Sequence, residues 1–493
     1  MAAVILVPGD VATIEGAFQV AQPGDEILVA PGQYDVDPIA VTTANLTLRS
    51  EPPRSAILLA TQFVPMFDVQ ADDFALEDVS LLPQDAVART RPTAHRTRIE
   101  GCLWEPPFYG YNGLQDEGPE TVVRGNEIHA FSPAVSSYSP SILIEENVFR
   151  ECGFSTVILR SGGTVRGNEF RDNANISDTG TPGQGGALRL MGAHSVVIED
   201  NLFTGNLTDG WDGESGQGQG GAISLELASA TIEGNVFRRN QSLQGGAIFA
   251  QYSNATIRGN LFYANTDSVQ YAENGLRGRG GALYFYESTG LVEGNTLVGN
   301  TALVDGAAIY MTVSAIEFRN NLVAGNRSDG GGVTTADIAP LAWECNDVWS
   351  SGASEYAGWP DPTGTDGNVS ADPLFCDASS GDFSIDASSP CAPAQSDGCG
   401  LIGAYGIGCG VTSVPEGGGL TGAVAAYPNP AVDHLWLRLA SGAAGDIDVF
   451  DASGRRVRSL HWSGDGDGTS SSGTGSAGSL FWDLRGDGGA LLP

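Results

Sequence analysis

The stretch Gly245-Gly-Ala-Ile-Phe-Ala-Gln-Tyr-Ser-Asn-Ala-Thr-Ile-Arg-Gly-Asn-Leu-Phe-Tyr-Ala-Asn265 decides the fold of this chain. Apolar and polar residues alternate in three short pieces, around Ile248, Ile257 and Phe262, with Gly, Ser and Asn between them. A period of two is typical of β-strands, whereas an amphipathic helix has a period of 3.6. The stretch therefore predicts three short strands joined by turns.

The same pattern repeats along the chain. Gly-Gly-Ala or Gly-Ala-Ala segments begin at Gly185, Gly220, Gly245, Gly280 and Gly306. An Asn landmark recurs at Asn126, Asn147, Asn168, Asn201, Asn235, Asn260, Asn295 and Asn321, with spacings from 21 to 35 residues. Such spacings fit coils of 21–26 residues, some of which carry insertions of about ten. Three strands per coil, stacked in parallel, predict an all-β fold: a right-handed parallel β-helix, or solenoid.

Fixed positions within the repeat predict what the inside of this solenoid contains. Apolar residues stand three before the landmark Asn (Ile198, Ile232, Ile257, Val292, Phe318) and two after it (Phe203, Phe237, Phe262, Leu297, Val323). Five after it stands a second Asn series: Asn173, Asn206, Asn240, Asn265, Asn300 and Asn326. We expect the apolar positions to stack in a core and each Asn to bond its copy in the next coil. Cys102 and Cys152 occupy Asn positions, so we interpret both as buried spacers.

The charge of the chain excludes several functions. Its 493 residues include 24 Lys and Arg and 59 Asp and Glu, a formal net charge of −35, and all 24 cations are Arg. Without lysine there is no Schiff-base or P-loop chemistry. Nucleic acids and anionic membrane surfaces both need a basic footprint, so neither is an expected partner. No run reaches the ~18 apolar residues of a membrane helix, so we expect no membrane span.

The cysteines point to an oxidising compartment. Five of the seven stand close together in sequence, at Cys345, Cys376, Cys391, Cys399 and Cys409, without the C-x-x-C pairs of a zinc site. This pattern predicts disulfides. We expect Cys391 to pair with Cys399 and Cys345 with Cys376, which leaves Cys409 odd. The N-terminus does not read as a signal peptide, so we expect an exported protein, extracellular or on the cell surface, whose leader lies outside this sequence.

The repeats carry a family resemblance over about residues 120–330. The paired Gly-Gly-Ala-Ile and Phe-x-x-Asn signatures, such as Phe203 to Asn206 and Phe262 to Asn265, resemble those of polymorphic outer-membrane adhesins and of pectate-lyase-like β-helix proteins. The resemblance implies the β-helix fold and an exported protein. It leaves the activity open, because that class includes lyases, hydrolases, adhesins and structural proteins.

The two ends of the chain also resemble known pieces. Thr13 to Tyr34 is similar to the opening of many β-helix proteins, which predicts a short capping helix within about residues 1–25. The segment at about 330–410 resembles their disulfide-rich closing part, which places the β-helix at 1–410 and a linker at 411–425. Residues 426–493, with Tyr427-Pro-Asn-Pro430 and Phe481-Trp-Asp-Leu-Arg485, resemble the small Ig-like β-sandwich sorting domain of the type IX secretion system. The Gly-x-Tyr strand that closes this domain does not follow, so the resemblance implies a truncated domain with the secretion machinery as partner.

One outward column of aromatic residues is the candidate ligand-binding site. If Leu283 and its equivalents point inward, Phe249, Tyr284 and Tyr310 point outward in three consecutive coils, and Tyr286 lies two residues beyond Tyr284. The insertions 206–219 and 264–279 come directly before these strands, and the first contributes Trp211. We expect a groove in which sugar rings stack on the aromatic ladder. Two alternatives remain open: the loops bury the aromatics, or the ladder contacts another copy of the chain.

Catalytic and metal-binding residues are weaker candidates. Arg189, Glu226 and Glu287 lie on or beside the same face and are the residues that a lyase or glycoside hydrolase would use. Asp209, Asp212 and Glu214 offer three oxygen ligands for calcium, without matching a known calcium loop. We therefore predict an exported, surface-associated protein that binds an extracellular polysaccharide or another cell-surface polymer, as an adhesin or structural rod. The alternative is a polysaccharide lyase or glycoside hydrolase that uses the same face.

Overall fold

The computed structural model describes residues 2–106, 112–177, 183–210, 218–267, 278–328, 331–349 and 354–409, together with five strands between residues 424 and 482. It divides into two units: residues 1–371 with 402–404, and residues 372–401 with 405–493. The predicted linker 411–425 lies outside the described residues up to position 423. The predicted domain boundaries stay predictions.

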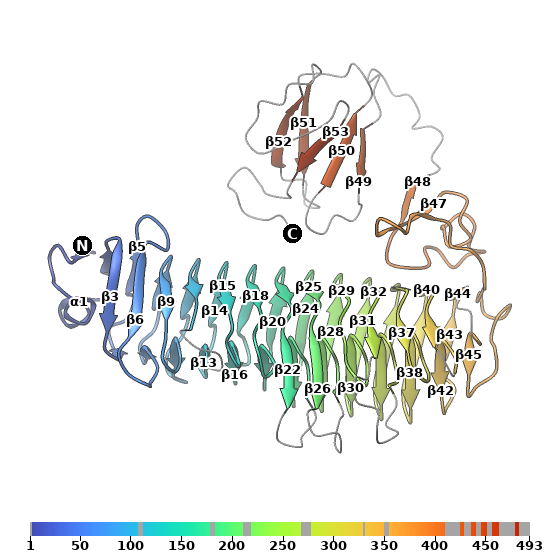
Figure 1. Cartoon of the computed structure of the whole chain (residues 1–493), viewed down its shortest axis with the longest axis horizontal. Helices are drawn as coiled ribbons and strands as arrows, with labels where there is room; N and C mark the ends of the chain where they lie inside the picture. Colours follow the sequence, from blue (N-terminus) through green and yellow to red (C-terminus); the bar gives the residue numbers. More distant parts are fainter. Residues whose placement is uncertain are drawn as a thin grey trace. The chain divides into compact units, whose positions relative to one another are not determined.

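The first unit is a parallel β-helix, as the repeats predict (Figure 1). Each coil gives one strand to sheet A, then one to sheet B and one to sheet C, and every strand pairs in parallel with its counterpart in the next coil. In sheet A, for example, Ile232 pairs with Ile257 and Ile257 pairs with Val292. The fold class predicted from the sequence is confirmed.

Sheet A has 14 strands: β1 (Val4–Val7), β2 (Glu26–Val29), β5 (Thr47–Ser50), β8 (Ala75–Glu77), β11 (Arg98–Glu100), β14 (Val122–Arg124), β17 (Leu143–Glu145), β20 (Gly163–Arg166), β24 (Val196–Glu199), β28 (Ser229–Glu233), β31 (Asn254–Arg258), β35 (Thr289–Glu293), β39 (Ala315–Arg319) and β43 (Ala342–Glu344). Sheet B has 13: β3 (Gly32–Val36), β6 (Ala56–Ala60), β9 (Ser80–Leu82), β12 (Leu103–Trp104), β15 (Glu127–His129), β18 (Val148–Arg150), β21 (Glu169–Arg171), β25 (Leu202–Thr204), β29 (Val236–Arg238), β32 (Leu261–Tyr263), β36 (Thr296–Val298), β40 (Leu322–Ala324) and β44 (Asp347–Trp349).

Sheet C also has 13 strands: β4 (Ile39–Val41), β7 (Phe67–Val69), β10 (Ala88–Thr90), β13 (Leu114–Asp116), β16 (Val135–Ser137), β19 (Val157–Leu159), β23 (Leu188–Met191), β27 (Ile223–Glu226), β30 (Ile248–Gln251), β34 (Leu283–Tyr286), β38 (Ile309–Thr312), β42 (Thr334–Ala336) and β45 (Tyr356–Ala357). Short strands lie between sheets B and C in some coils: β22 (Ala174–Ser177) with β26 (Leu207–Gly210), and β33 (Thr266–Asp267) with β37 (Thr301–Ala302) and β41 (Arg327–Ser328).

Identical side chains stack inside the solenoid. Phe149, Phe170, Phe203, Phe237 and Phe262 form one pile with ring centroids 4.8–4.9 Å apart and rings within 4° of parallel. All five rings are buried and belong to one continuous apolar core. The predicted core columns are therefore confirmed.

Two ladders of Asn side chains hold the turns. In the first, Asn147 Nδ2 donates to Asn168 Oδ1 at 3.0 Å and also to the carbonyl of Val123 at 2.8 Å. Each amide thus satisfies backbone groups and its own copy at once, which offsets the cost of burying it. In Cys102 and Cys152 the thiol takes the place of the amide, and burial raises the pKa of each thiol to about 12. Both cysteines are buried spacers, as the sequence predicts.

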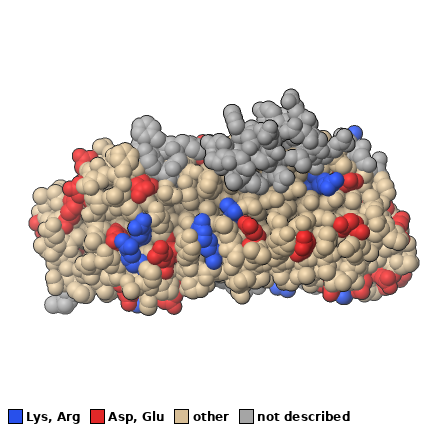
Figure 2. Space-filling model, turned by 90° about the horizontal axis from the view of Figure 1, so that it is seen from below, with Lys and Arg blue, Asp and Glu red and all other residues tan. Residues whose placement is uncertain are grey.

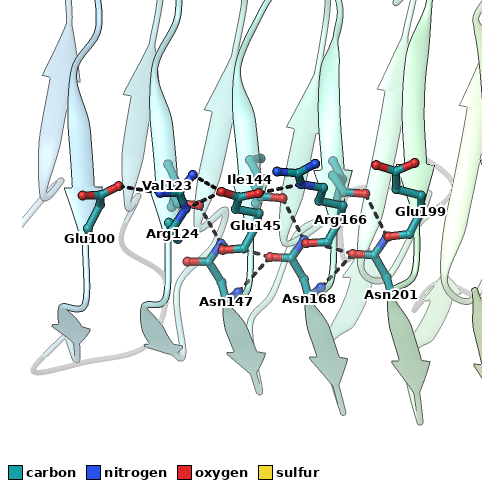
Figure 3. Close-up of polar contacts among 11 residues, drawn as sticks. Glu100, Val123, Arg124, Ile144, Glu145, Asn147, Arg166, Asn168, Glu199 and Asn201 are labelled. Carbon is teal, nitrogen blue, oxygen red and sulfur yellow. Dashed lines mark hydrogen bonds and ion pairs between the residues drawn. The ribbon is translucent and has the colours of Figure 1, made fainter. Parts of the chain in front are cut away.

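The outer surface of sheet A carries a ladder of charges. One outward column consists of Arg49, Glu77, Glu100, Arg124, Glu145, Arg166, Glu199, Glu233, Arg258, Glu293, Arg319 and Glu344. Glu145 lies between Arg124 and Arg166 and pairs with both, while Arg124 also reaches Glu100 at 3.4 Å (Figure 3). The carboxylate of Glu145 is almost fully buried by these two guanidinium groups.

A short helix closes the N-terminal end of the solenoid. α1 (Ile14–Val20) begins after Thr13, whose side chain accepts a hydrogen bond from the Gly16 N–H at 3.1 Å. Ile14 and Ala17 are buried, and the Phe18 ring packs 6.2 Å from the Phe67 ring. This helix confirms the predicted cap.

The second unit corrects the predicted disulfides. Its first sheet contains β46 (Phe375–Asp377), β47 (Asp382–Asp386) and β48 (Ile407–Cys409), and Cys376 is bonded to Cys409. Cys399 is also disulfide-bonded, whereas Cys391 keeps a buried thiol. The Cys391–Cys399 and Cys345–Cys376 pairs are therefore wrong. Cys376 in β46 and Cys409 in β48 have a Cα–Cα distance of 5.8 Å, although 33 residues separate them in the sequence.

The remaining strands of the second unit form two small antiparallel sheets. One contains β49 (Val424–Tyr427), β50 (Leu435–Leu439) and β53 (Ser479–Trp482), and the other contains β51 (Gly445–Phe450) and β52 (Arg456–Trp462). Such sheets are compatible with a small β-domain here.

An inward and an outward residue of the same strand test the register. Ile257→Asp places an unpaired charge in a core column, so we expect it to unfold the β-helix. Thr256→Asp, one residue away on the outer surface of sheet A, should change the free energy of unfolding by about 0.5 kcal/mol or less. Circular dichroism melts of both variants measure this, and equal melting temperatures would contradict the register.

The ladder of charges should contribute to stability where it is buried. Glu145→Gln leaves Arg124 and Arg166 without their shared acceptor, so we expect unfolding to become easier by about 1–2 kcal/mol, discounted for the exposure of both arginines. The control is Glu199→Gln in the same column, expected within about 0.5 kcal/mol of the parent. Urea unfolding curves measure both values.

Candidate functional site

Two columns of side chains point outward from sheet C. The first runs from Arg89 through Gln115, Ser136, Ile158, Arg189, Ser224, Phe249, Tyr284 and Tyr310 to Thr335. In the second, Met191, Glu226, Gln251, Tyr286 and Thr312 follow one another. Figure 2 shows the molecule from the side of sheet C, where acidic groups lie among the basic ones. By the residues of these two columns, the face is polar, with Arg89 and Arg189, toward one end and aromatic toward the other.

The aromatic ladder exists, but it is not an exposed platform. The Phe249 and Tyr284 ring centroids are 5.2 Å apart, and those of Tyr284 and Tyr310 are 4.9 Å apart. However, only 3% of Phe249 and 5% of Tyr284 is exposed. The prediction of an exposed stacking surface at these two residues is wrong, and the alternative of burial describes them better.

Part of the cover comes from the chain that precedes each strand. A Cβ on Gly280 would meet Tyr284 Cβ at 3.0 Å, so the backbone turns back directly onto this side chain. The Arg279 guanidinium lies over the Tyr310 ring, 5.1 Å from its centroid. Burial raises the pKa of the Tyr284 hydroxyl to about 12. Alternation gave the direction of these side chains correctly, but not what lies over them.

Exposed aromatic surface lies at the end of the strand instead. Tyr252 is 45% exposed, and its ring packs edge-on against Tyr286 with centroids 5.6 Å apart. Hydrogen bonds to Glu287 and Tyr252 raise the pKa of Tyr286 to about 12. Tyr286 was expected from the sequence, whereas Tyr252 was missed. It stands one residue past its strand, where the period of two no longer assigns a direction.

An arginine and a carboxylate meet on the same face. Arg189 Nη2 lies 3.3 Å from Glu226 Oε2, and the side chain of Arg189 is 21% exposed. Burial, followed in a smaller part by the nearby charge of Arg160, lowers the pKa of Arg189. Its Nε–H is buried without a hydrogen-bond acceptor. The Arg160 guanidinium donates to Ser136 Oγ at 2.7 Å and lies 4.9 Å from the centroid of the Tyr138 ring. Arg189 thus pairs with a carboxylate and Arg160 with a hydroxyl group, which leaves N–H donors on both guanidinium groups for oxygen atoms of a ligand.

The structure brings together only some of the candidate residues. Glu287 lies at the corner beside Tyr286, three coils from Arg189, or about 14 Å at the usual strand spacing. Asp209 lies in β26, whereas Trp211, Asp212 and Glu214 lie outside the described residues. Among the described residues, no three His, Cys, Asp or Glu side chains form a group that could hold a metal ion. No helix in the described part of the chain is long and apolar enough to cross a membrane.

Comparison with known proteins agrees with this architecture. The profile of the family described as "Right handed beta helix region" matches residues 111–275 and 214–339. Together with the three parallel sheets, this match supports a right-handed parallel β-helix fold. No curated protein matches it in sequence.

Several solved structures match most of the chain at low identity. The alginate lyase AlyGC of the PL6 family is 16% identical, over 82% of this chain and 56% of that chain, with a TM-score of 0.41. The alginate lyase AlyF-OU02 is 14% identical, over 73% and 88%, with a TM-score of 0.36. The A-module of the mannuronan C-5 epimerase AlgE6 from Azotobacter vinelandii is 14% identical, over 71% and 91%, with a TM-score of 0.35. Identities and TM-scores this low do not show what this chain does.

Truncation of two tyrosines one coil apart should destabilise the protein to different degrees. Tyr284→Ala removes a buried ring, so we expect a loss of about 2–4 kcal/mol in the free energy of unfolding. Tyr252→Ala removes an exposed ring and should cost less than about 1 kcal/mol. Thermal melts compare the two, and equal losses would show that exposure does not separate the roles of these tyrosines.

Proposed function

We propose that this chain is an exported β-helix protein that binds polysaccharide along the outer face of sheet C. The observation that carries the proposal is a row of side chains in five consecutive coils: Arg160, Arg189, Glu226, Gln251 and Tyr286. Strands of neighbouring coils lie about 4.8 Å apart, close to the length of one sugar residue in an extended chain. Each coil can therefore meet about one sugar.

The chemistry of the row suits a carbohydrate. The arginines offer N–H donors, Glu226 and Gln251 offer acceptors for hydroxyl groups, and Tyr286 offers a ring against which a sugar can pack. The net charge of −35 opposes nucleic acid as an alternative polymer.

The compartment follows from the same proposal. The Cys376–Cys409 disulfide supports an oxidising, extracellular environment. We place the protein at the cell surface as an adhesin or structural rod, and we propose that residues 426–493 serve the type IX secretion machinery. The two small antiparallel sheets in this region are compatible with that role. Calcium binding at Asp209, Asp212 and Glu214 also stays a proposal.

A polysaccharide lyase is the second candidate, favoured by the Arg189–Glu226 pair. In such a reaction a base removes the proton next to the carboxylate of a uronic acid unit. The electron pair forms the C4–C5 double bond, and the glycosidic oxygen at C4 leaves. Arg189, which lies beside Glu226 on the outer face of sheet C, is the candidate base.

Binding is tested with a double variant on this face. Arg189→Ala combined with Tyr286→Ala removes donors and a ring, so we expect roughly 30-fold weaker binding, from a loss of about 2 kcal/mol. Affinity electrophoresis in gels that contain cellulose derivatives, mannan, xylan, pectate or alginate measures retardation. Arg258→Ala, on the outer surface of sheet A, is the matched control and should bind like the parent.

Two outcomes would count against this proposal. If none of these polysaccharides retards the parent protein, or if the double variant is retarded equally, the face is not the binding site. Ultraviolet absorbance of the unsaturated product separates the lyase from the binding protein, because only β-elimination forms the conjugated double bond.

A further inference from the structure

The turns that lead from sheet C to sheet A carry an unusual set of side chains. Leu227, Tyr252, Glu287 and Val313 occupy the same turn position in four consecutive coils, one residue after the outward column Glu226, Gln251, Tyr286 and Thr312. We call these four residues the corner ridge. All have left-handed backbones, with φ of 53°, 51°, 45° and 50°. In the preceding coil the position belongs to Gly192, with φ of 63°.

Left-handed backbone is unfavourable for large side chains, and most of all for a β-branched one such as Val313. At the other two corners of the coil, the left-handed positions are mostly occupied by glycine or by small or polar residues. The described left-handed positions after sheet A are Asp78, Gly101, Gly125, Glu146, Gly167, Asp200, Gly234, Gly259, Gly294, Asn320 and Cys345. Those after sheet B are Ala130, Glu151, Asp172, Gly205, Arg239, Ala264, Gly299 and Gly325. These are the described positions directly after a strand, and none of them holds a large apolar residue, although Phe154, with φ of 50°, lies four residues past β18 in one turn after sheet B. Turn geometry directly after a strand therefore does not demand a large apolar residue at the corner ridge.

Core packing does not demand these side chains either. Leu227 is 59% exposed and Val313 is 53% exposed, while Tyr252 is 45% exposed, with its ring against Tyr286. Each of these residues therefore strains the backbone without burying its side chain within the chain. A strained residue that makes few contacts of its own is expected where the contact is made with something else.

We propose that the corner ridge is a rail for an uncharged glycan chain that runs parallel to the helix axis, with about one sugar per coil. The proposal rests on polysaccharide binding by the adjoining face of sheet C and names the class of polymer. The C–H faces of successive sugars contact Leu227, Tyr252 and Val313, whose spacing follows the ~4.8 Å rise of the coils. Glu287 accepts hydrogen bonds from the hydroxyl groups of the sugar between them.

The flanks of the ridge suit a sugar chain. On one side stand Gln251 and Thr312 at the ends of β30 and β38. On the other side, Asn254 Nδ2 donates a hydrogen bond to the hydroxyl oxygen Oγ1 of Thr289 at 2.8 Å, and both residues are exposed. These neutral donors and acceptors border an apolar strip. A neutral pyranose ring is complementary to this arrangement, because it has apolar C–H faces with hydroxyl groups at their edges.

The charges near the ridge exclude a polyanion. In the sequence, no Arg stands within three residues of any ridge position, and the chain has no lysine. Arg189, which lies beside Glu226, is already paired with that carboxylate. Glu226 and Glu287 supply negative charge beside the ridge. Asp337 adds a third carboxylate at its end, where it accepts hydrogen bonds from the Thr312 hydroxyl at 2.7 Å and the Val313 N–H at 2.9 Å. A uronic acid chain would meet like charges here, whereas an uncharged glycan would not. A second copy of this chain, with its own charge of −35, is disfavoured for the same reason.

The left-handed backbone gives this proposal a sharp test. In the double variant Leu227→Gly, Val313→Gly, glycine relieves the strain, so we expect the melting temperature to stay equal or rise. Binding of neutral hexasaccharides should nevertheless weaken about tenfold, because two apolar contacts are lost. Isothermal titration with cellohexaose, mannohexaose and xylohexaose measures binding. A matched control, Asp200→Gly with Asn320→Gly, relieves the same backbone strain at the corner after sheet A and should leave binding unchanged.

The outcomes separate this proposal from the broader one. If the hexauronates of pectate or alginate bind, lose affinity in the Arg189→Ala, Tyr286→Ala variant, and neutral hexasaccharides do not bind, the corner ridge proposal fails and the sheet C proposal stands. If no oligosaccharide binds, both fail. A lower melting temperature in the glycine double variant would assign Leu227 and Val313 a structural role. A concentration-dependent dimer that this variant abolishes would assign the ridge to a second copy instead.

Discussion

Parallel hydrogen bonding between successive coils is the constraint on which the rest of this structure depends. It places equivalent residues of neighbouring coils at one strand spacing, as the 4.8 Å between the Phe149 and Phe170 rings shows directly. Every side chain must therefore be compatible with the residue at the same position one coil away. Phe meets this condition by stacking, Asn by bonding its copy, and Arg by alternating with Glu. The composition of each column follows from this condition.

The same constraint turns the outside of the protein into a periodic surface. A surface residue such as Tyr252 has neighbours at the same position in the coils before and after it, one strand spacing away. A ligand with a similar repeat can therefore contact several of these residues. This is why a polymer is a better candidate than a small molecule for the face of sheet C and for its corner. Because the chain has no lysine, arginines supply the permanent positive charges of sheet C, as they do in the ladder of charges on sheet A.

The candidate site could be predicted only in part. Alternation along β34 and β38 correctly directed Tyr284 and Tyr310 away from the core, and their rings do form a ladder. It did not show that Gly280 turns back onto Tyr284, because that contact depends on the path of the preceding turn. Tyr252 was missed for a related reason: it lies in a left-handed turn, and a strand period assigns no direction there.

The sequence by itself determined the fold class, the capping helix, the core columns, both Asn ladders and the buried role of Cys102 and Cys152. These features are local and repeated, so each copy in the sequence confirms the others, and the period of two fixes which side of the strand they occupy. The tertiary structure alone decided the Cys376–Cys409 pairing, the meeting of Arg189 with Glu226 and the burial of Phe249 and Tyr284. Each of these depends on the path of turns between strands, which occurs once and leaves no repeated pattern to read.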